Sequence, residues 1–470
     1  MALTVSVDEI VYGSGNPLLG VRPHWKRIRL GEIASVLNGF AFKSAQFTKG
    51  EGMPLIRIRD VGSDSTDTNY VGEFDERYIV EPGDLLVGMD GDFSCARWRG
   101  PRGLLNQRVC KVTLQSDQYH PRFLDFALPA YLKAINDATS SVTVKHLSSR
   151  TIEYIPLPFP PLKDQEDIVA ELEEQFSRLD EAVANLKRVK ANLKRYKVAV
   201  LSAAVEGRLV PTEAERARQE GRPVETAERF LQHIREIRRS LWRDKARYKE
   251  PVAPDPAGLP ELPLGWVWVH LVQVSEASKH ALKAGPFGSA LKKEHYSRSG
   301  YKVYGQEQVI RGDHRFGDYF VDEAKFQELE SCSIKPGDLL LSLVGTAGRV
   351  LVVPHDAQPG IINPRLLKLS LNSSVIYPAY AAYMLQSSWA ARFFKSQAHG
   401  GTMEILNLGI VKALAVPLPP YAEQERIVSE IERLLSIAAE VQGQVDVNLQ
   451  RVQQLHGETL ARMFARCDVQ

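Results

Sequence analysis

One four-residue motif in the sequence resembles part of an active site. Leu418-Pro419-Pro420-Tyr421 matches three positions of the Asn/Asp/Ser-Pro-Pro-aromatic tetrad with which DNA amino-methyltransferases hold the target amine. A leucine side chain cannot accept hydrogen bonds from that amine. The related segment Phe159-Pro160-Pro161-Leu162 departs from the tetrad at both ends. We therefore predict that both segments are junctions between a strand and a helix, without a role in methyl transfer.

Other motifs for catalysis or cofactor binding are missing from the sequence. It contains no G-x-x-x-x-G-K-[ST] phosphate loop, no H-E-x-x-H pair and no clustered Cys/His metal site. Asp318, Glu323 and Lys325 loosely resemble a nuclease D…E-x-K set, but the first half of the chain has no counterpart, and we interpret them as surface charges. The sequence predicts a chain with no catalytic residues, no metal and no cofactor of its own.

A second group of residues could contact DNA. Arginine can hold guanine and glutamine can hold adenine through two hydrogen bonds, whereas lysine more often meets phosphate. Residues 55–59 alternate like a half-buried strand, which would place Arg57 and Arg59 on one face. For each candidate, a solvated surface charge is an equally good interpretation. The candidates are Lys43, Arg57, Arg59, Arg97, Arg99, Arg102, Gln107, Arg108, Lys145 and His146 in the first half, and Lys292, Lys293, Gln306, Gln308, Arg311, Arg349, Arg365, His399 and Thr402 in the second.

Length and composition limit the class of protein. A chain of 470 residues suggests two or three domains. Its 59 basic and 57 acidic residues nearly cancel, so DNA contact would depend on where the basic residues lie. The sequence has no secretory leader pattern and no apolar run of membrane length. These two absences favour a soluble protein. The four cysteines, Cys95, Cys110, Cys332 and Cys467, form no C-x-x-C pair, so we expect the reducing cytoplasm.

The elements that must position these candidates repeat along the chain. Residues 160–169 match residues 419–428, which include the same Pro-Pro-x-x-x-Gln-Glu pattern. Pro-Gly-Asp-Leu-Leu occurs at 82–86 and again at 336–340, where we predict a turn that leads into a strand. Further matches in the same order are Trp25 with Trp266, Asn106 with Asn363 and Arg108 with Arg365.

Each repeat predicts a β-rich globular unit followed by a long helix, an α+β fold. Residues 339–344 and 350–353 have the pattern of buried strands. A strongly basic helical segment is expected from Thr226 to Tyr248, followed by a proline-rich, stiff connector at 251–263. The predicted parts are an N-terminal extension at 1–20, β-rich globular domains at 21–161 and 259–420, and helical regions at 162–258 (with the linker) and 421–470.

The two long helices share one apolar stripe with alternating spacings of four and three residues, as in a coiled coil. An ordinary core helix is the alternative, but a stripe about 50 Å long needs a partner helix. We predict that the two helices pair antiparallel within the chain, which relates the repeats by a pseudo-twofold axis. The predicted seam consists of Ile168, Leu172, Leu179, Leu186 and Leu193 in the first helix, and Ile427, Ile431, Leu434, Val441, Val445 and Val452 in the second.

This pattern resembles the specificity subunits of type I restriction-modification systems. The two Pro-Pro-x-x-x-Gln-Glu junctions are its most specific signature. The segments at 25–42, 285–289 and 201–209 and the two Pro-Gly-Asp-Leu-Leu turns are also similar to that family. The resemblance covers nearly the whole chain and leaves out residues 1–20.

The resemblance implies a non-catalytic subunit in which the globular domains at 21–161 and 259–420 are target recognition domains, each of which reads one half of a bipartite DNA target. It implies that the helices set the spacing and dock two methyltransferase subunits, and that restriction subunits with a motor and nuclease join them. S-adenosylmethionine, ATP and Mg²⁺ would be bound by those partners. Since the candidate readers of the two halves differ, we expect an asymmetric target. The alternatives are a coiled-coil adaptor with two domains for ligands other than DNA, or a stand-alone DNA methyltransferase or nuclease.

Overall fold

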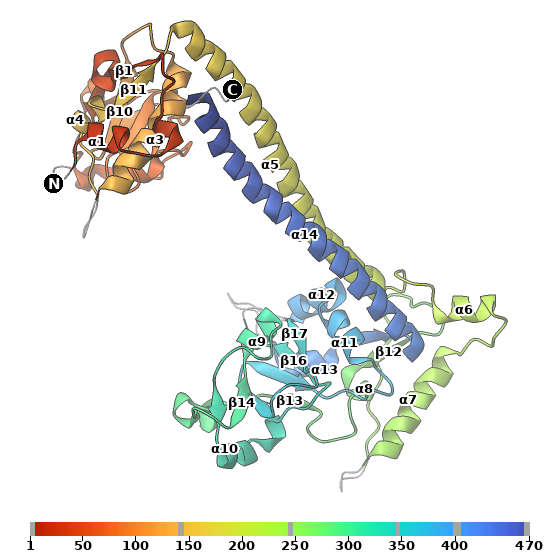
Figure 1. Cartoon of the computed structure of the whole chain (residues 1–470). Helices are drawn as coiled ribbons and strands as arrows, with labels where there is room; N and C mark the ends of the chain where they lie inside the picture. Colours follow the sequence, from red (N-terminus) through yellow and green to blue (C-terminus); the bar gives the residue numbers. More distant parts are fainter. Residues whose placement is uncertain (1–4, 140–144, 243–247, 345–347, 398–405, 465–470) are drawn as a thin grey trace. The chain divides into compact units, whose positions relative to one another are not determined.

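The computed structural model describes residues 5–139, 145–242, 248–344, 348–397 and 406–464 (Figure 1). The chain divides into two compact units. The first contains Met1–Lys187 and Asp446–Gln470, and the second contains Arg188–Val445. Each unit holds one β-rich domain and part of each of two long helices, α5 (Leu162–Val205) and α14 (Tyr421–Phe464). The predicted fold of two β-rich domains with long helices is confirmed.

The first domain is built around strand β10 (Val109–Leu114), which pairs antiparallel with β2 (Ala34–Asn38) and β7 (Leu85–Gly88). Beside this sheet, β4 (Met53–Ile56) and β9 (Gly103–Leu105) pair in parallel. The amphipathic helix α3 (Pro121–Ala138) buries its apolar face in the core. The other elements are α1 (Val7–Tyr12), η1 (Pro17–Leu19), β1 (Lys26–Arg29), α2 (Leu30–Ile33), η2 (Ser44–Gln46), β3 (Phe47–Thr48), η3 (Ile58–Asp60), β5 (Asn69–Tyr70), η4 (Glu76–Tyr78), β6 (Ile79–Val80), β8 (Cys95–Arg97), α4 (Ser149–Glu153) and β11 (Pro156–Phe159).

The second domain repeats this topology. Strand β19 (Leu366–Leu369) lies between β13 (Leu282–Ala284) and β16 (Leu339–Ser342), and β14 (Tyr301–Tyr304) pairs in parallel with β18 (Gly360–Ile362). As β1 pairs with β11, so β12 (Val267–His270) pairs with β20 (Ala415–Leu418) just before a long helix. The other elements are α8 (Leu271–Val274), η5 (Gly288–Ala290), η6 (Lys293–His295), α9 (Gln306–Arg311), β15 (Phe320–Val321), α10 (Glu323–Glu328), η7 (Glu330–Cys332), β17 (Val350–Val352), α11 (Pro378–Leu385), α12 (Ser388–Gln397) and α13 (Leu408–Ala413).

The two Pro-Gly-Asp segments are turns of the same type. Gly83 and Gly337 have φ angles of 99° and 86°, which glycine adopts more readily than other residues. Asp84 and Asp338 each accept a hydrogen bond from the backbone N–H three residues before them, at 2.9 and 3.0 Å. Strands β7 and β16 begin directly after these turns. The prediction of a turn that leads into a strand is correct in both domains.

The long helices run antiparallel within each unit. In the first unit, Arg462 of α14 donates a hydrogen bond to Oε1 of Gln175 in α5 at 3.1 Å, and the rings of His456 and Phe176 lie 4.8 Å apart. In the second unit, Lys197 of α5 donates to Oε1 of Gln442 in α14 at 3.0 Å. Both helices have 44 residues and so extend beyond the predicted apolar stripe.

All residues of the predicted seam except Val441 are buried or half-buried. Val441 is 39% exposed, and the half-buried Gln442 lies in its place. Ala438 and Val445 are buried on either side, and a residue three or four positions after Ala438 faces nearly the same direction. In α14 the residue four positions after Ala438 makes the contact with α5: Gln442 accepts the hydrogen bond from Lys197.

Two further helices follow α5 in the second unit. They are α6 (Glu213–Gln219) and α7 (Ala227–Leu241). The predicted basic helix therefore ends at Leu241, seven residues earlier than expected, and residues 243–247 lie outside the described part of the chain. Helix α7 buries Phe230 and Ile234 and also Arg238, whose guanidinium donates to the backbone oxygen of Ser275. No helix in the described ranges combines the length and apolar character needed to cross a membrane.

Candidate nucleic-acid interface

Three loops of the first domain meet beside the N-terminal end of β10. The backbone N–H of Met89 donates to the carbonyl oxygen of Arg108 at 2.8 Å, and that of Leu147 donates to the oxygen of Met89 at 2.7 Å. Gly91 also donates its N–H to the oxygen of Lys145 at 3.1 Å. We call residues 89–91, 106–108 and 145–147 the three-loop site. It brings together four of the predicted DNA-binding residues: Gln107, Arg108, Lys145 and His146.

An aspartate that was not among the predicted contacts lies at the centre of the three-loop site. Oδ2 of Asp90 is 3.2 Å from Nη1 of Arg108, and its Oδ1 is 2.7 Å from Nδ1 of His146. The aspartate side chain is only 13% exposed, whereas those of Arg108 and His146 are 61% and 57% exposed. Lys145 instead turns its ammonium group back to the carbonyl oxygen of Asn136 at 2.6 Å. Asp90 thus holds two exposed basic side chains at one point of the surface.

The second domain has the same backbone arrangement with different side chains. Leu343 donates its N–H to the oxygen of Arg365 at 3.0 Å, and Leu406 donates to the oxygen of Leu343 at 2.9 Å. Arg365 thereby matches Arg108, while Val344 stands where the first domain has Asp90. The predicted residues His399 and Thr402, and part of the predicted loop at 140–146, lie outside the described residues.

A close backbone approach fixes another loop beside this site in both domains. A Cβ atom on Gly39 would lie 2.0 Å from the carbonyl oxygen of Asn106, and one on Gly285 would lie 1.9 Å from that of Asn363. Only glycine permits this approach. The two Asn-x-Arg segments are therefore held against matching loops in the two domains.

An exposed phenylalanine follows each of these glycines. Phe40 is 47% exposed, and its carbonyl oxygen accepts the N–H of Gln107 at 2.8 Å. Phe287 is 84% exposed, the highest value among the large apolar side chains of the described residues. An exposed large apolar side chain beside polar loops is a sign of a binding surface. Neither residue was among the predicted contacts, although the glycine-aromatic pattern was visible in the sequence.

Arg57 and Arg59 do not share a strand face, contrary to the prediction. Strand β4 ends at Ile56 because Asp60 accepts the backbone N–H of Arg57 at 2.9 Å and turns the chain into η3. Arg57 is half-buried, and Arg59 lies on η3, where it pairs with Asp67. The two arginines therefore have separate surroundings.

The other candidates of the first domain divide into paired and exposed residues. Arg97 donates to Asp125 and to the carbonyl oxygen of Gly83, both at 2.7 Å, and so connects β8 to α3. Arg102 forms an ion pair with Glu81 at 3.0 Å. Lys43 and Arg99 are exposed and have no ion pair within the described residues.

Gln306 and Gln308 of the second domain are buried. Nε2 of Gln306 donates to Oγ of Ser342 at 2.8 Å. Gln308 is 2% exposed, accepts the N–H of Gly305 at 2.9 Å and donates to the oxygen of Phe316 at 2.8 Å. Their amides thus hold the fold of α9 and its surroundings. The remaining candidates are exposed: Lys292 near Glu294, Lys293, Arg311 against the ring of Phe316, Arg349 and Arg365.

The glutamines of the two Pro-Pro-x-x-x-Gln-Glu motifs lock each domain to its long helix. Gln165 and Gln424 are fully buried, and each makes one hydrogen bond as acceptor and two as donor. This signature is therefore a structural junction with matching bonds in both repeats. Gln165 accepts from the N–H of His120 and donates to the oxygens of Pro160 and Gln118, at 2.7, 2.9 and 3.0 Å, and Gln424 accepts from Tyr377 and donates to Pro419 and Val375 at the same distances.

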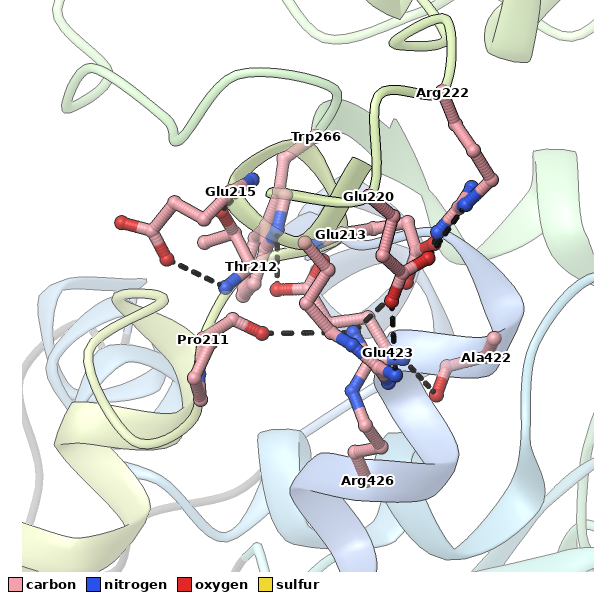
Figure 2. Close-up of polar contacts among 11 residues, drawn as sticks. Pro211, Thr212, Glu213, Glu215, Glu220, Arg222, Trp266, Ala422, Glu423 and Arg426 are labelled. Carbon is pink, nitrogen blue, oxygen red and sulfur yellow. Dashed lines mark hydrogen bonds and ion pairs between the residues drawn. The ribbon is translucent and has the colours of Figure 1, made fainter. Parts of the chain in front are cut away.

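The second junction contains an additional polar cluster (Figure 2). The buried carboxylate of Glu423 accepts the indole N–H of Trp266 at 2.9 Å and the backbone N–H of Glu213 at 2.7 Å. Glu213 in turn pairs with Arg426 at 2.9 Å and with Arg222 at 2.8 Å. Burial raises the pKa of Glu423, and the hydrogen bonds from Glu213 and Trp266 offset this only in part. The cluster fastens α6 to the start of α14.

The residues that resembled catalytic motifs are buried in the fold or bonded to neighbouring side chains. Leu418 is fully buried in β20, and Tyr421 begins α14, so Leu418-Pro419-Pro420-Tyr421 is a junction between a strand and a helix, as predicted. Glu323 accepts the hydroxyl of Tyr301 at 2.6 Å, and Lys325 pairs with Glu328 at 2.7 Å. Among the residues that the structure describes, no three His, Cys, Asp or Glu side chains are grouped as metal ligands.

The chain is similar in sequence to known proteins over nearly its whole length. The family model for the type I restriction modification DNA specificity domain matches residues 23–195 and 285–446. The chain is 32% identical over 473 residues to the type I restriction enzyme EcoBI specificity subunit of Escherichia coli, covering 99% of this chain and 90% of that protein. It is 18% identical to the MjaVIII specificity subunit of Methanocaldococcus jannaschii, covering 93% of both chains.

A solved structure shares the fold. It comes from work on the complex assembly and conformational transition of the type I R-M system. The TM-score is 0.60 with 16% sequence identity, and the match covers 94% of this chain and 98% of that one.

Proposed function

The chain belongs to the type I restriction-modification DNA specificity family, and from this premise we propose that its two β-rich domains each read one half of a bipartite, asymmetric DNA target. The observation that carries the proposal is the repeated three-loop arrangement. Both domains hold an exposed arginine on the same backbone frame, yet the neighbouring side chains differ, with Asp90 in one and Val344 in the other. Two domains that share a backbone arrangement but differ in their side chains are suited to recognising two different half-targets.

The helices would connect DNA reading to the chemistry of partner proteins. An α-helix of 44 residues is about 66 Å long, which would let α5 and α14 set the spacing of the half-targets and dock two methyltransferase subunits. Those partners would bind S-adenosylmethionine, and restriction subunits would supply ATP- and Mg²⁺-dependent cleavage. This chain would have no catalytic role.

Two other functions have less support. A stand-alone methyltransferase would need an acceptor for the target amine, and the motif that comes nearest to the tetrad offers Leu418, which is buried in β20. A coiled-coil adaptor for ligands other than DNA would not need arginines presented on matching loops of two domains. The family model that matches this chain describes a DNA specificity domain, which also favours DNA as the ligand.

Methylome sequencing tests the proposal. Cells that express the chain with its methyltransferase partner should show methylation at a two-part motif, and cells without the chain should lose methylation at both parts. Exchange of residues 259–420 for those of a relative should change one part of the motif and leave the other. Methylation that persists without the chain, or by the purified chain alone, would contradict the proposal.

A further inference from the structure

We propose that Asp90, Arg108 and His146 form a specificity-determining cluster that reads a guanine-containing base pair in the half-target of the first domain. The inference rests on the proposed function and names the residues and the type of base that one domain recognises. Its basis is the shared contact of Asp90 with both basic side chains.

The aspartate fixes the direction of the arginine. Arg108 alone would be a flexible surface side chain, but its Nη1 is held 3.2 Å from Oδ2 of Asp90. A guanidinium group has five N–H donors, so the groups that do not face Asp90 remain available to a ligand. Two parallel donors of this kind match O6 and N7 of guanine, the most common specific contact of arginine in the major groove. A supported arginine loses less freedom on binding than an unsupported one.

The aspartate also orients His146. A carboxylate can only accept hydrogen bonds, so Nδ1 of His146 carries the proton that it shares with Oδ1 of Asp90, 2.7 Å away. The other ring nitrogen, Nε2, therefore points away from Asp90. Because the histidine side chain is 57% exposed, that nitrogen can meet the neighbouring base or sugar. One carboxylate thus presents two oriented polar groups.

The charges of the cluster favour a base edge over phosphate as its ligand. A site that only grips the DNA backbone gains most from basic side chains without acidic partners. Here Asp90 lowers the net positive charge, and it would repel a phosphate that approached Arg108 closely. Directed hydrogen bonds to base edges read the sequence, whereas contacts to phosphate do not.

The second domain provides an internal comparison. Arg365 has the same backbone bond to the preceding loop as Arg108, since Leu343 donates to its carbonyl oxygen. Val344 occupies the place of Asp90 and cannot hold an arginine through an ion pair. The two domains therefore differ at the position that controls the arginine, as expected if this position contributes to the choice of half-target.

The backbone of the cluster supports a functional role. Arg108 has a φ angle of 74°, and Phe93 in the adjacent loop has one of 51°. These are the two non-glycine residues with positive φ among those that the structure describes. Such conformations are rare for residues with a side chain and are concentrated at binding sites. In this conformation the side chain of Arg108 forms an ion pair with Asp90 while its carbonyl oxygen accepts the backbone N–H of Met89.

The test measures methylation rates of the full-length chain with its methyltransferase partner on a set of DNA duplexes, each changed at one base pair of the target. Arg108→Ala and Asp90→Asn should both relax the choice at the same G·C pair in one half-target, with discrimination there reduced roughly ten- to hundredfold. The other half-target should be read as before. His146→Ala should affect the same or an adjacent pair, and Asp90→Glu should restore part of the discrimination.

Arg77→Ala is the matched control, because Arg77 is an exposed arginine of the same domain that pairs with Asp75 outside the three-loop site and is not among the candidate DNA contacts. It should leave discrimination at every position unchanged. If Asp90→Asn disturbs folding, Arg108→Ala still tests the contact, and reading of the second half-target shows that the chain is intact.

Three outcomes would overturn the inference and are distinguishable from a failure of the proposed function. Arg108→Ala could slow methylation equally on all duplexes, which would identify a phosphate contact. The two variants could affect different base pairs, or neither could change the motif. In each case the wild-type chain would still direct a two-part motif. If the wild-type chain directs no such motif, the proposed function itself is wrong.

Discussion

Trp266 donates its indole N–H to the buried carboxylate of Glu423 at 2.9 Å, a bond between the start of the second domain and the first turn of its following helix. The matching residues of the first repeat are Trp25 and Asp164. The indole nitrogen of Trp25 is buried and has no hydrogen-bond partner among the described residues. Asp164 is one methylene group shorter than Glu423. Two junctions with the same glutamine bonds therefore differ at the tryptophan indole, and the second junction also carries the polar cluster around Glu213.

The first prediction follows from that difference. Trp266→Phe should lower the free energy of unfolding by about 1–3 kcal/mol more than Trp25→Phe, because it leaves a buried carboxylate with one donor fewer. Both changes remove similar ring volume, so Trp25→Phe is the matched control. Urea unfolding followed by circular dichroism measures the difference. Equal losses in the two variants would show that the indole bond contributes little.

The second prediction concerns pH. Burial raises the pKa of Glu423 above its usual value of 4.5, so the folded chain binds a proton there more tightly than the unfolded chain does. The contribution of this group to stability is then fully present below about pH 4.5 and is lost as the pH rises through the folded-state pKa.

Glu423→Gln removes this titrating group. The stability difference between the wild-type chain and the variant should therefore shift against the wild type as the pH rises from 4.5. Urea unfolding at a series of pH values measures the two slopes. Asp164→Asn serves as the control at the first junction. A wild-type chain that gains stability relative to Glu423→Gln over this range would contradict the prediction.

The repeats and long helices were predictable because they leave regular patterns in the sequence. A turn such as Pro82-Gly83-Asp84 depends on the backbone preferences of its own residues, and the spacing of Ile168 and Leu172 shows the helix that they share. The seam at Val441 was predicted incorrectly because the residues three and four positions after Ala438 both lie close to the helix face of Ala438. Only contact with the partner helix, through Lys197 and Gln442, selects between them.

The candidate interface was predictable in part. Gln107, Arg108, Lys145 and His146 were found by residue type, but their meeting point depends on backbone bonds between loops far apart in sequence. Asp90 was missed because an acidic residue is not an obvious DNA contact, and its role comes from the two basic side chains that it holds. Gln308 was included because its side chain could read adenine, although the fold buries it.

The third prediction separates a candidate reader from a structural residue of the same type. Arg97 was predicted to contact DNA, yet its guanidinium bonds to Asp125 of α3 and to the turn at Gly83. Arg97→Ala should lower the free energy of unfolding by roughly 1–3 kcal/mol, because a carboxylate that is 10% exposed loses one of its two arginine partners. Calorimetry of the full-length chain measures this change.

The neighbouring Arg99 is exposed and is the matched control, since Arg99→Ala should change stability by less than about 0.5 kcal/mol. Methylation of the duplex set at a temperature where both variants are folded gives the second readout. There Arg97→Ala should recognise the same target as the wild-type chain. A change in the preferred base with unaltered stability would show that Arg97 reads DNA and that its ion pair with Asp125 is secondary. The expected result is the reverse, because the bonds of Arg97 join two elements of the domain core.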